Sequence, residues 1–165
     1  MSLTSPELLN SQHLLTDFAC GIDALDDWLK RRALANQTSG ASRTFVTCID
    51  NKVVGYYALA SGGISSEAAL GKFRRNMPNP IPVVILARLA IDRACQGQGL
   101  GRALFRDAAL RIDRAADTIG IRGIIVHAIS AEAKNFYVAL GFDESPIEPM
   151  TLMVTLNDLR ASIAD

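Results

Sequence analysis

The sequence predicts a mixed α/β protein of the α+β class, in which a central sheet is flanked by helices. Three observations lead to this class: two β-rich runs that form a hairpin, a long apolar strand further along the chain, and helices that alternate with the later strands. The chain has 165 residues, the length of one ordinary domain, and 49% of them are hydrophobic, which is enough for a buried core. We therefore expect a single domain over residues 1–165.

The first predicted elements are a helix and a hairpin. Residues 22–37 are expected to be helical because apolar side chains recur there at steps of three and four. These side chains are Ile22, Leu25, Trp28, Leu29 and Ala33. Residues 43–49 and 53–60 are β-rich runs around a short polar turn, which is typical of a hairpin. Residues 1–17 are expected to form a short strand or an arm, and residues 61–82 an irregular segment.

The second half of the chain alternates strands with helices. A central strand is expected over residues 83–92, and a long helix from the glycines at 97–101 to about residue 119. The side chains expected on the buried face of that helix are Leu100, Leu104, Ala108, Ile112, Ala115 and Ile119. The remaining expected elements are strands over 124–129 and 150–154 and helices over 131–140 and 156–163.

Composition and charge exclude several classes of protein. Seventeen basic and seventeen acidic residues give a net charge of zero, so a nucleic-acid partner would need a local basic patch. Three scattered cysteines argue against a disulfide scaffold and fit a reducing cytosol, and two histidines without a Cys-x-x-Cys pair argue against structural zinc. No apolar run reaches the roughly 20 residues of a membrane-spanning helix, and residues 1–17 lack the pattern of a secretory signal. We therefore expect a cytoplasmic protein with no membrane partner.

The most informative segment is a glycine turn between the apolar strand and the long helix. Gly97, Gly99 and Gly101 alternate there, and because glycine has no Cβ the main chain can approach a ligand closely. The first N–H groups of a helix have no partner within the helix, and the helix dipole favours an anion beside them. We therefore expect a diphosphate cradle made of main-chain amides, to which Arg102 adds a positive charge.

Two widespread phosphate motifs do not fit this turn. A P-loop requires Gly-Lys-Ser/Thr, whereas Gly101 is followed by Arg102 and Ala103. The dinucleotide fingerprint G-x-G-x-x-G requires its third glycine at the position of Arg102. What remains is the pattern Q-x-x-G-x-G, made by Gln96, Gly99 and Gly101. The alternative is a glycine-rich connection that binds no ligand.

The sequence Gln-Gly-Gln-Gly-Leu-Gly at residues 96–101 resembles the acyl-CoA pyrophosphate loop of the GNAT N-acetyltransferases. Residues 133–142 resemble the second signature of that family, a helix with the pattern A-x-x-F/L-Y-x-x-x-G-F. The resemblance implies the GNAT fold, with a mixed, mainly antiparallel central sheet flanked by helices, and acetyl-CoA as co-substrate without a metal. The coenzyme contacts that it implies are Leu89, Ala90, Ile91, Gln96, Gly97, Gln98, Gly99, Leu100, Gly101 and Arg102.

The same resemblance implies a catalytic role for Tyr137. Many members of the family place at this position the tyrosine that protonates the departing sulfur, and a phenol with a pKa of about 10 stays protonated at neutral pH. Helical spacing alone favours packing for this ring, as it does for Phe136. Ser130 departs from the pattern, because many members carry Asn there.

No general base is placed by a motif. By residue type the candidates are Asp92, His127 and Glu132, and His127, inside an apolar strand, is expected to be a core histidine. A base is least needed for an α-amino acceptor, whose pKa is about 7.7–8.0, compared with about 10.4 for a lysine amine.

The N-terminal segment resembles one branch of the family. Residues 18–30 are similar to its opening F-x-C-G-x-x-x-L-D-x-W-L, and residues 43–46, 55–59 and 87–92 are also similar. This branch contains toxins of type II toxin–antitoxin modules of the TacT and AtaT kind. The resemblance implies acetylation of the α-amino group of aminoacyl-tRNA, which blocks translation, a ribbon-helix-helix antitoxin as partner, and a homodimer. The alternatives are an acetyltransferase for a small-molecule amine or a protein N-terminus, and a non-catalytic acyl-CoA-binding module.

Four basic residues are the candidates for binding charged tRNA. Lys30 begins a basic cluster off the apolar stripe of the first helix, and Arg74 and Arg75 lie in the irregular segment. The alternative for both clusters is an ordinary solvent-exposed surface that binds no nucleic acid. Arg88 lies in an otherwise apolar strand and needs a partner there, so it is expected either to be structural or to line the acceptor channel.

Overall fold

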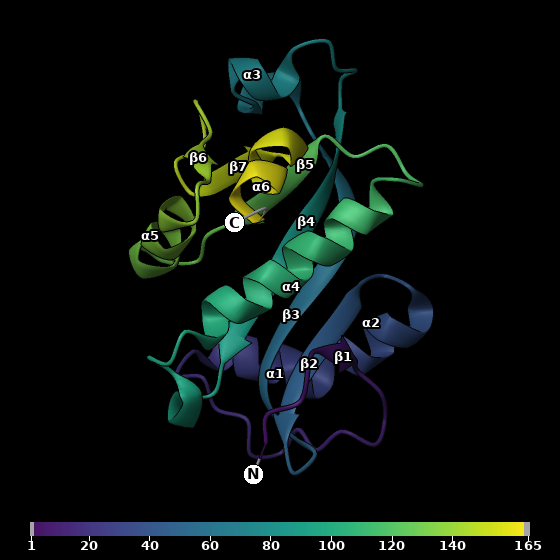
Figure 1. Ribbon diagram of the computed structural model, residues 1–165, viewed down its shortest axis with the longest axis vertical. Helices are drawn as coiled ribbons and strands as arrows, with labels where there is room; N and C mark the ends of the chain where they lie inside the picture. The colour runs from purple at the N-terminus through teal and green to yellow at the C-terminus, as the bar shows by residue number, and fades with distance from the viewer. Residues whose placement is uncertain (1, 164–165) are drawn as a thin grey trace. The chain divides into compact units, whose positions relative to one another are not determined.

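The structure is a computed structural model and describes residues 2–163 (Figure 1). The strands of this part of the chain are β1 (Glu7–Leu8), β2 (Arg43–Ile49), β3 (Lys52–Ile64), β4 (Ile81–Ile91), β5 (Gly123–His127), β6 (Asp143–Glu144) and β7 (Thr151–Thr155). Its helices are α1 (Asp23–Arg31), α2 (Ala33–Ser39), α3 (Gly71–Arg74), α4 (Leu100–Ala115), α5 (Ala131–Ala139) and α6 (Leu156–Ile163), with the short 3₁₀ helices η1 (Ser66–Ala68) and η2 (Arg93–Cys95).

The strands form one mixed sheet in the order β1-β2-β3-β4-β5-β7-β6. β1, β2 and β3 pair antiparallel, as do β5 with β7 and β7 with β6. β4 and β5 pair parallel, through Val84 with Ile124 and Ile85 with Ile125. A mainly antiparallel mixed sheet with helices confirms the predicted fold class.

The chain divides into two compact units. Unit 1 comprises Met1–Ala60 and Ala87–Ala108, and unit 2 comprises Ser61–Leu86 and Ala109–Asp165. β3, β4 and α4 each contribute residues to both units. The single domain over residues 1–165 stays a prediction.

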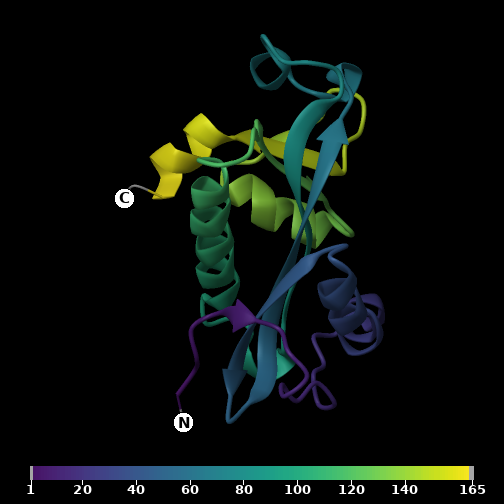
Figure 2. The same ribbon diagram turned by 90° about the vertical axis from the view of Figure 1, so that its right-hand side faces the viewer.

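In unit 1, helices cover both faces of the sheet. Figure 2 shows α1 and α2 on one side of β2 and β3, and the start of α4 on the other. Leu104 of α4 packs so closely on β3 that a Cβ at Gly55 would lie 3.1 Å from its Cδ1 atom. The core beneath α1 and α2 is built from apolar side chains of the helices, the N-terminal segment and the strands. Its largest fully buried members are Phe18, Leu29 and Tyr56.

The single helix predicted over residues 22–37 is wrong, because the structure has two helices there. The main chain leaves the helical conformation at Arg32, with φ −122° and ψ −31°. This change of direction lets Leu29 before it and Ala33 after it both reach the core with no exposed surface. Ile22, predicted on the buried stripe, precedes α1 and is 42% exposed.

In unit 2, the segment predicted to be irregular contains regular structure. β3 continues to Ile64, through Gly62, where a Cβ would lie 2.5 Å from the Cδ1 atom of Ile85. The strand therefore packs against Ile85 because glycine has no side chain at this position. α3 follows, held by the Arg122 guanidinium, which donates hydrogen bonds to the carbonyl oxygens of Lys72 (2.5 Å) and Phe73 (2.8 Å).

The long helix is shorter than predicted. α4 begins at Leu100 and ends at Ala115, and three-residue turns follow, with Asp117 N–H bonded to the Arg114 carbonyl. Leu104, Ala108 and Ile112 are buried as predicted. Ala115, the last residue of α4, and Ile119, beyond the end of the helix, were predicted on the same face but are exposed.

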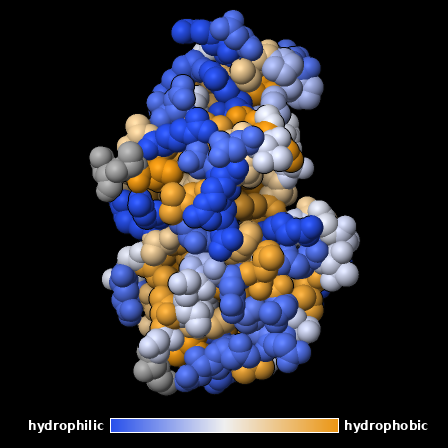
Figure 3. All heavy atoms as spheres, turned by 45° about the vertical axis from the view of Figure 1, so that its right-hand side comes forward, coloured by the Kyte–Doolittle hydropathy of each residue, from blue (hydrophilic) through white to orange (hydrophobic). Residues whose placement is uncertain are grey.

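The surface carries scattered apolar side chains. In Figure 3 hydrophobic side chains form several separate patches between hydrophilic ones. Small, separate apolar patches of this kind are ordinary on a folded protein. Within residues 2–163, no helix combines the length and the apolar character needed to cross a membrane.

Candidate active site

The predicted coenzyme loop follows β4 in unit 1 and is held by side-chain hydrogen bonds. Asp92 directly follows the strand, and its Oδ1 accepts a hydrogen bond from the Ala94 N–H (2.9 Å), which caps η2. Its Oδ2 accepts a second bond from the Ala19 N–H (3.0 Å). The carboxylate of this base candidate therefore serves to position the main chain.

Gln96 also positions the loop. Its Nε2 atom donates hydrogen bonds to the carbonyl oxygens of Ile91 and Cys20, both at 2.8 Å. The glutamine of the Q-x-x-G-x-G pattern thus ties the loop to the end of β4 and to the segment before α1.

The glycines of the loop have the conformation that a close main-chain approach requires. Gly97 and Gly99 have φ of +77° and +80°, and no atom lies within 4 Å of the position that a Cβ would occupy at either residue. α4 begins directly afterwards, and the first hydrogen bond of its turn runs from the Ala103 N–H to the Gly99 carbonyl (3.1 Å). Within residues 2–163, the N–H groups of residues 97–102 donate no hydrogen bond.

This arrangement fits a diphosphate. The unpaired N–H groups lie at the N-terminus of a 16-residue helix, where its dipole favours negative charge. Beside them is a groove of about 400 Å³ in unit 1. The groove is lined by Leu3, Ile49, Cys95, Gln98, Gly99, Leu100 and Ala103. Arg102, in the first turn of α4, is exposed.

The strand segment before the loop offers main chain to a ligand. Among the described residues, the ladder between β4 and β5 consists of Val84 and Ile85 with their partners, so it does not reach Leu89–Ile91. Ala90 is 5% exposed and belongs to the core of unit 1. Leu89 and Ile91 are half-buried.

Tyr137 lies on α5 in unit 2. Ser130 begins this helix, and its Oγ accepts a hydrogen bond from the Ala133 N–H (3.0 Å), so the serine at this position caps the helix. The Tyr137 ring is 6% exposed and contacts Phe136 and Phe142 edge-on, with centroid distances of 5.1 and 5.5 Å. Burial raises the pKa of Tyr137 above the ordinary value of a phenol, so the hydroxyl stays protonated.

The remaining base candidates do not form a catalytic cluster. His127, predicted in the core, is exposed at the end of β5, and its Nδ1 lies 3.1 Å from the Thr151 hydroxyl. The prediction is wrong because the side chain follows the last buried residue of the strand. Glu132 is exposed in the first turn of α5. Within residues 2–163, no group of three or more Cys, His, Asp or Glu could hold a metal ion.

The four basic candidates are divided between the units. Lys30 is exposed on α1 and Arg88 is half-buried on β4, both in unit 1. Arg74 and Arg75 are exposed at the end of α3 in unit 2, where Lys72 forms ion pairs of 3.0 Å with Asp143 and Asp158. These carboxylates raise the pKa of Lys72 and balance its charge.

The partner of Arg88 is Trp28, which the sequence did not predict. The Cζ atom of this guanidinium lies 4.4 Å from the ring centroid of Trp28 on α1. The predicted need for a partner is confirmed, but Trp28 was assigned only to the core stripe. An arginine in an apolar strand and a tryptophan on an amphipathic helix were the available signals, and only the fold joins them.

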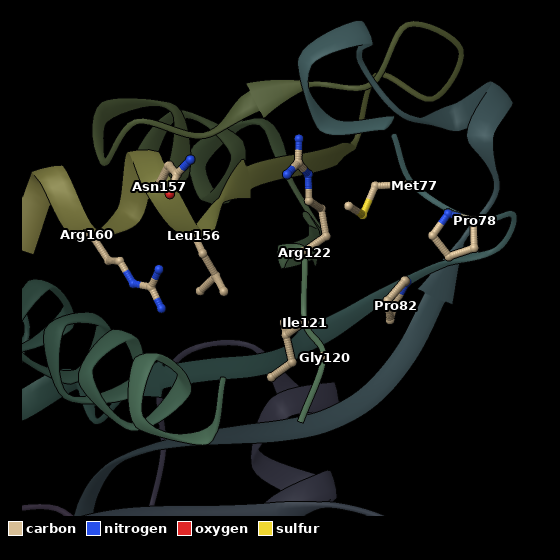
Figure 4. A pocket seen from close by; sticks show the side chains of 9 residues that line it. All are labelled: Met77, Pro78, Pro82, Gly120, Ile121, Arg122, Leu156, Asn157 and Arg160. Carbon is tan, nitrogen blue, oxygen red and sulfur yellow. The ribbon is translucent and has the colours of Figure 1, made fainter. Parts of the chain in front are cut away.

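A second cavity, of about 400 Å³, lies in unit 2 and contains none of the predicted site residues. Figure 4 shows its lining side chains from α6, from residues 77–82 and from residues 120–122. Both of its guanidinium groups are engaged: Arg122 holds the carbonyls of α3, and Arg160 pairs with Asp113.

The mixed sheet, the glycine turn and the unpaired amides at the start of α4 define a coenzyme A-dependent acyltransferase, and the chain belongs to the GNAT acetyltransferase family. Residues 40–144 match its acetyltransferase (GNAT) domain. The chain is 51% identical over 162 residues to the tRNA-acetylating toxin of Mycobacterium tuberculosis, and the match covers 98% of both proteins.

Solved structures of toxins have the same fold. A mutant of KacT in which one tyrosine is replaced by phenylalanine matches with a TM-score of 0.90 and 26% identity, over 98% of this chain and 99% of that chain. AtaT complexed with acetyl-methionyl-tRNAfMet matches with a TM-score of 0.89 and 30% identity, over 97% and 98%. AtaT has also been solved with acetyl-CoA and with the C-terminus of the antitoxin AtaR.

Proposed function

We propose that this protein transfers the acetyl group of acetyl-CoA to the α-amino group of aminoacyl-tRNA and that it blocks translation as the toxin of a toxin–antitoxin module. The observation that carries the proposal is the open main-chain cradle at residues 97–102, with positive φ at Gly97 and Gly99 and free N–H groups at the start of α4. The similarity of the whole chain to a tRNA-acetylating toxin supports the acceptor.

The cradle binds and orients the coenzyme. The N–H groups of residues 97–102 hold its two linked phosphates, and the main chain of Leu89–Ile91 holds the pantetheine arm. When bound, acetyl-CoA supplies an activated acetyl thioester. Holding the thioester and the amine in attack geometry lowers the activation barrier by up to roughly 7–11 kcal/mol.

Tyr137 acts as the general acid. As the amine nitrogen bonds to the acetyl carbon and the carbon–sulfur bond breaks, the Tyr137 hydroxyl donates its proton to the departing sulfur, and the amine loses its proton to water. Burial of the phenol keeps this proton in place at neutral pH. An α-amino group, with a pKa of about 7.7–8.0, is partly neutral there and does not need a dedicated base.

The basic side chains provide the affinity for tRNA. Arg74 and Arg75, exposed at the end of α3, and Lys30 on α1 bind backbone phosphates, while Arg88 binds nearer the reacting amine. Such contacts release counterions, so the affinity falls as salt rises. Because the net charge of the chain is zero, these local groups supply the attraction.

AtaT has been solved in complex with the C-terminus of the antitoxin AtaR. For this chain we propose a ribbon-helix-helix antitoxin, a homodimer and a cytoplasmic location, where charged tRNA and acetyl-CoA are both present.

Mass spectrometry of charged tRNA incubated with the protein and acetyl-CoA tests the proposal. We expect a mass increase of one acetyl group on the amino acid released from the tRNA. Acetylation of a small amine or a protein N-terminus, with charged tRNA left unmodified, would support the other acetyltransferase class instead. Coenzyme binding without turnover on any acceptor would show a non-catalytic module.

A further inference from the structure

We infer that Trp28 is a positioning residue for Arg88 and that the guanidinium which it holds binds a phosphodiester of the single-stranded 3′ end of charged tRNA. The inference rests on the proposed function, and it names the RNA group that Arg88 recognises and the residue that orients it.

Arg88 is the outermost layer of a stack that reaches into the core of unit 1. Its Cζ atom lies 4.4 Å from the centroid of the Trp28 ring. Below, the indole stacks on Tyr56, with centroids 6.0 Å apart and planes 12° apart. Phe18 then meets Tyr56 edge-on at 5.6 Å. Tyr56 and Phe18 are buried, so the support of the guanidinium is rigid.

The stack is also fixed to α1. The Tyr56 hydroxyl donates a 2.7 Å hydrogen bond to the Leu25 carbonyl, one turn before Trp28 on that helix. Tyr56 therefore sets both the position of the helix and the plane on which the indole rests. All of these residues belong to unit 1.

The hydrogen-bonding groups of Arg88 have no protein acceptor. Among residues 2–163 its contact is the indole face, and no carboxylate or carbonyl oxygen accepts a hydrogen bond from its guanidinium. A guanidinium has five N–H donors in a plane, and a half-buried cation without a counter-ion is unfavourable. Since Trp28 covers one face, the donors along the edge are left for an external anion. Their fork matches two phosphate oxygens.

The position of Arg88 fits the acceptor end of tRNA. Arg88 directly precedes Leu89–Ile91, the segment that we propose to hold the pantetheine arm. The reacting amino group is carried on the last nucleotide, and the nearest phosphodiester is one nucleotide unit away. When the amine reaches the thioester held by Leu89–Ile91, the nearest phosphodiester of the tRNA lies within reach of the Arg88 guanidinium.

Salt dependence of tRNA binding is the first test, and uncharged tRNA is the probe. We expect Arg88→Gln to raise the Kd about 10- to 100-fold, as for the loss of a charged hydrogen-bond pair, and to reduce the slope of log Kd against log salt by about 0.7. Trp28→Leu should have a similar effect, and Trp28→Phe, which keeps an aromatic face, should restore most of the affinity. Lys52→Gln, an exposed charge of the same unit that pairs with Asp17, is the matched control. An unchanged slope in Arg88→Gln would overturn the inference.

A pair of acceptors gives the second test. Charged tRNA has phosphodiesters next to the amino acid, whereas an aminoacyl-adenosine has none. We expect Arg88→Gln and Trp28→Leu to raise KM for charged tRNA with little change in kcat, and to leave KM for the aminoacyl-adenosine unchanged. An equal loss with both acceptors would place Arg88 at the amine or in the fold, and would refute the phosphate contact.

A failure of the phosphate contact can be distinguished from a failure of the proposed acetylation activity. If the wild-type protein acetylates neither acceptor, the proposed function fails, and the salt slope of tRNA binding still decides whether Arg88 contacts a phosphate. If Trp28→Leu does not fold, as judged by its thermal unfolding, Arg88→Gln carries the test, because it removes no buried ring.

Discussion

Gln96 and Cys20 are joined by a hydrogen bond of 2.8 Å, from the side-chain Nε2 atom of the first to the carbonyl oxygen of the second. The same nitrogen donates to the Ile91 carbonyl, also at 2.8 Å. The glutamine at the start of the Q-x-x-G-x-G pattern therefore organises the main chain around the loop. The glycines and the amides after it remain available for the phosphates that we propose they bind.

Replacing Gln96 by alanine should loosen the loop. Two hydrogen bonds contribute about 1–2 kcal/mol together, so we expect a Kd for acetyl-CoA about 5- to 30-fold higher, measured by calorimetry. Gln96→Glu should bind acetyl-CoA more weakly still, because a carboxylate would face two carbonyl oxygens. Unchanged affinity in both variants would show that the clamp has no effect on the cradle.

Gly99→Ala should reduce binding of acetyl-CoA by placing a methyl group in the cradle. Gly40, with φ +85° and open space at its Cβ position, is a matched control remote from the motif, since Gly99 has φ +80° and similar space. Both alanine variants should lose about 1–2 kcal/mol of unfolding free energy through the left-handed backbone. Only Gly99→Ala should weaken coenzyme binding, as titration calorimetry will show. Equal affinities would argue against a cradle at this turn.

Tyr137→Phe should lower kcat by roughly 10²–10⁴ with little change in either KM, because it removes the proton donor and keeps the buried ring. Burial raises the pKa of Tyr137, and the protonated form is the one that we propose to be active. The wild-type kcat should therefore show no alkaline fall below about pH 10. Full activity of the variant in a steady-state assay would exclude this hydroxyl from the mechanism.

The double variant Arg74→Gln, Arg75→Gln should bind charged tRNA more weakly and leave the binding of acetyl-CoA unchanged. Both side chains are exposed, and their loss leaves the ion pairs of Lys72 in place. It removes one long, exposed hydrogen bond, from Arg74 to the Ser66 carbonyl (3.4 Å), so the effect on the fold should be small. We expect a KM for charged tRNA about tenfold higher and a salt slope smaller by up to about 2. Lys52→Gln with Arg160→Gln removes two charges elsewhere and is the comparison. A slope equal to that of the wild type would remove these arginines from the tRNA surface.

The stability of the protein should fall as the solution becomes alkaline. Burial raises the pKa of both Cys20 and Cys48 from 9.0 to about 11. The unfolded chain thus loses these protons first, so the free energy of unfolding decreases between about pH 9 and pH 11. Denaturant titrations at several pH values measure the slope, which Cys20→Ala with Cys48→Ala should reduce. An equally steep decrease in the double variant would contradict this assignment.

Elements whose signals are local were predicted closely. The hairpin strand over residues 43–49 is β2, and the helix over 131–140 is α5, with Ser130 as its cap. Apolar periodicity, a capping serine and a glycine after the helix act within a few residues, so they can be read along the chain.

Elements that depend on contacts between distant residues were not predicted from the sequence. β3 packs closely against Ile85 at Gly62. α3 is held by hydrogen bonds from Arg122, which comes after α4 in the chain. The break at Arg32 has no glycine or proline to signal it, because burial of Leu29 and Ala33 decides it.

The same division holds for the site. The type of chemistry follows from residue type and local order, because these alone give glycines that permit positive φ and a helix start that leaves amides unpaired. Which groups remain available depends on how distant segments pack. This packing assigns the side chains of Asp92 and Gln96 to the main chain, and places Trp28 beneath Arg88. These pairings join residues far apart along the chain, and packing brings them together.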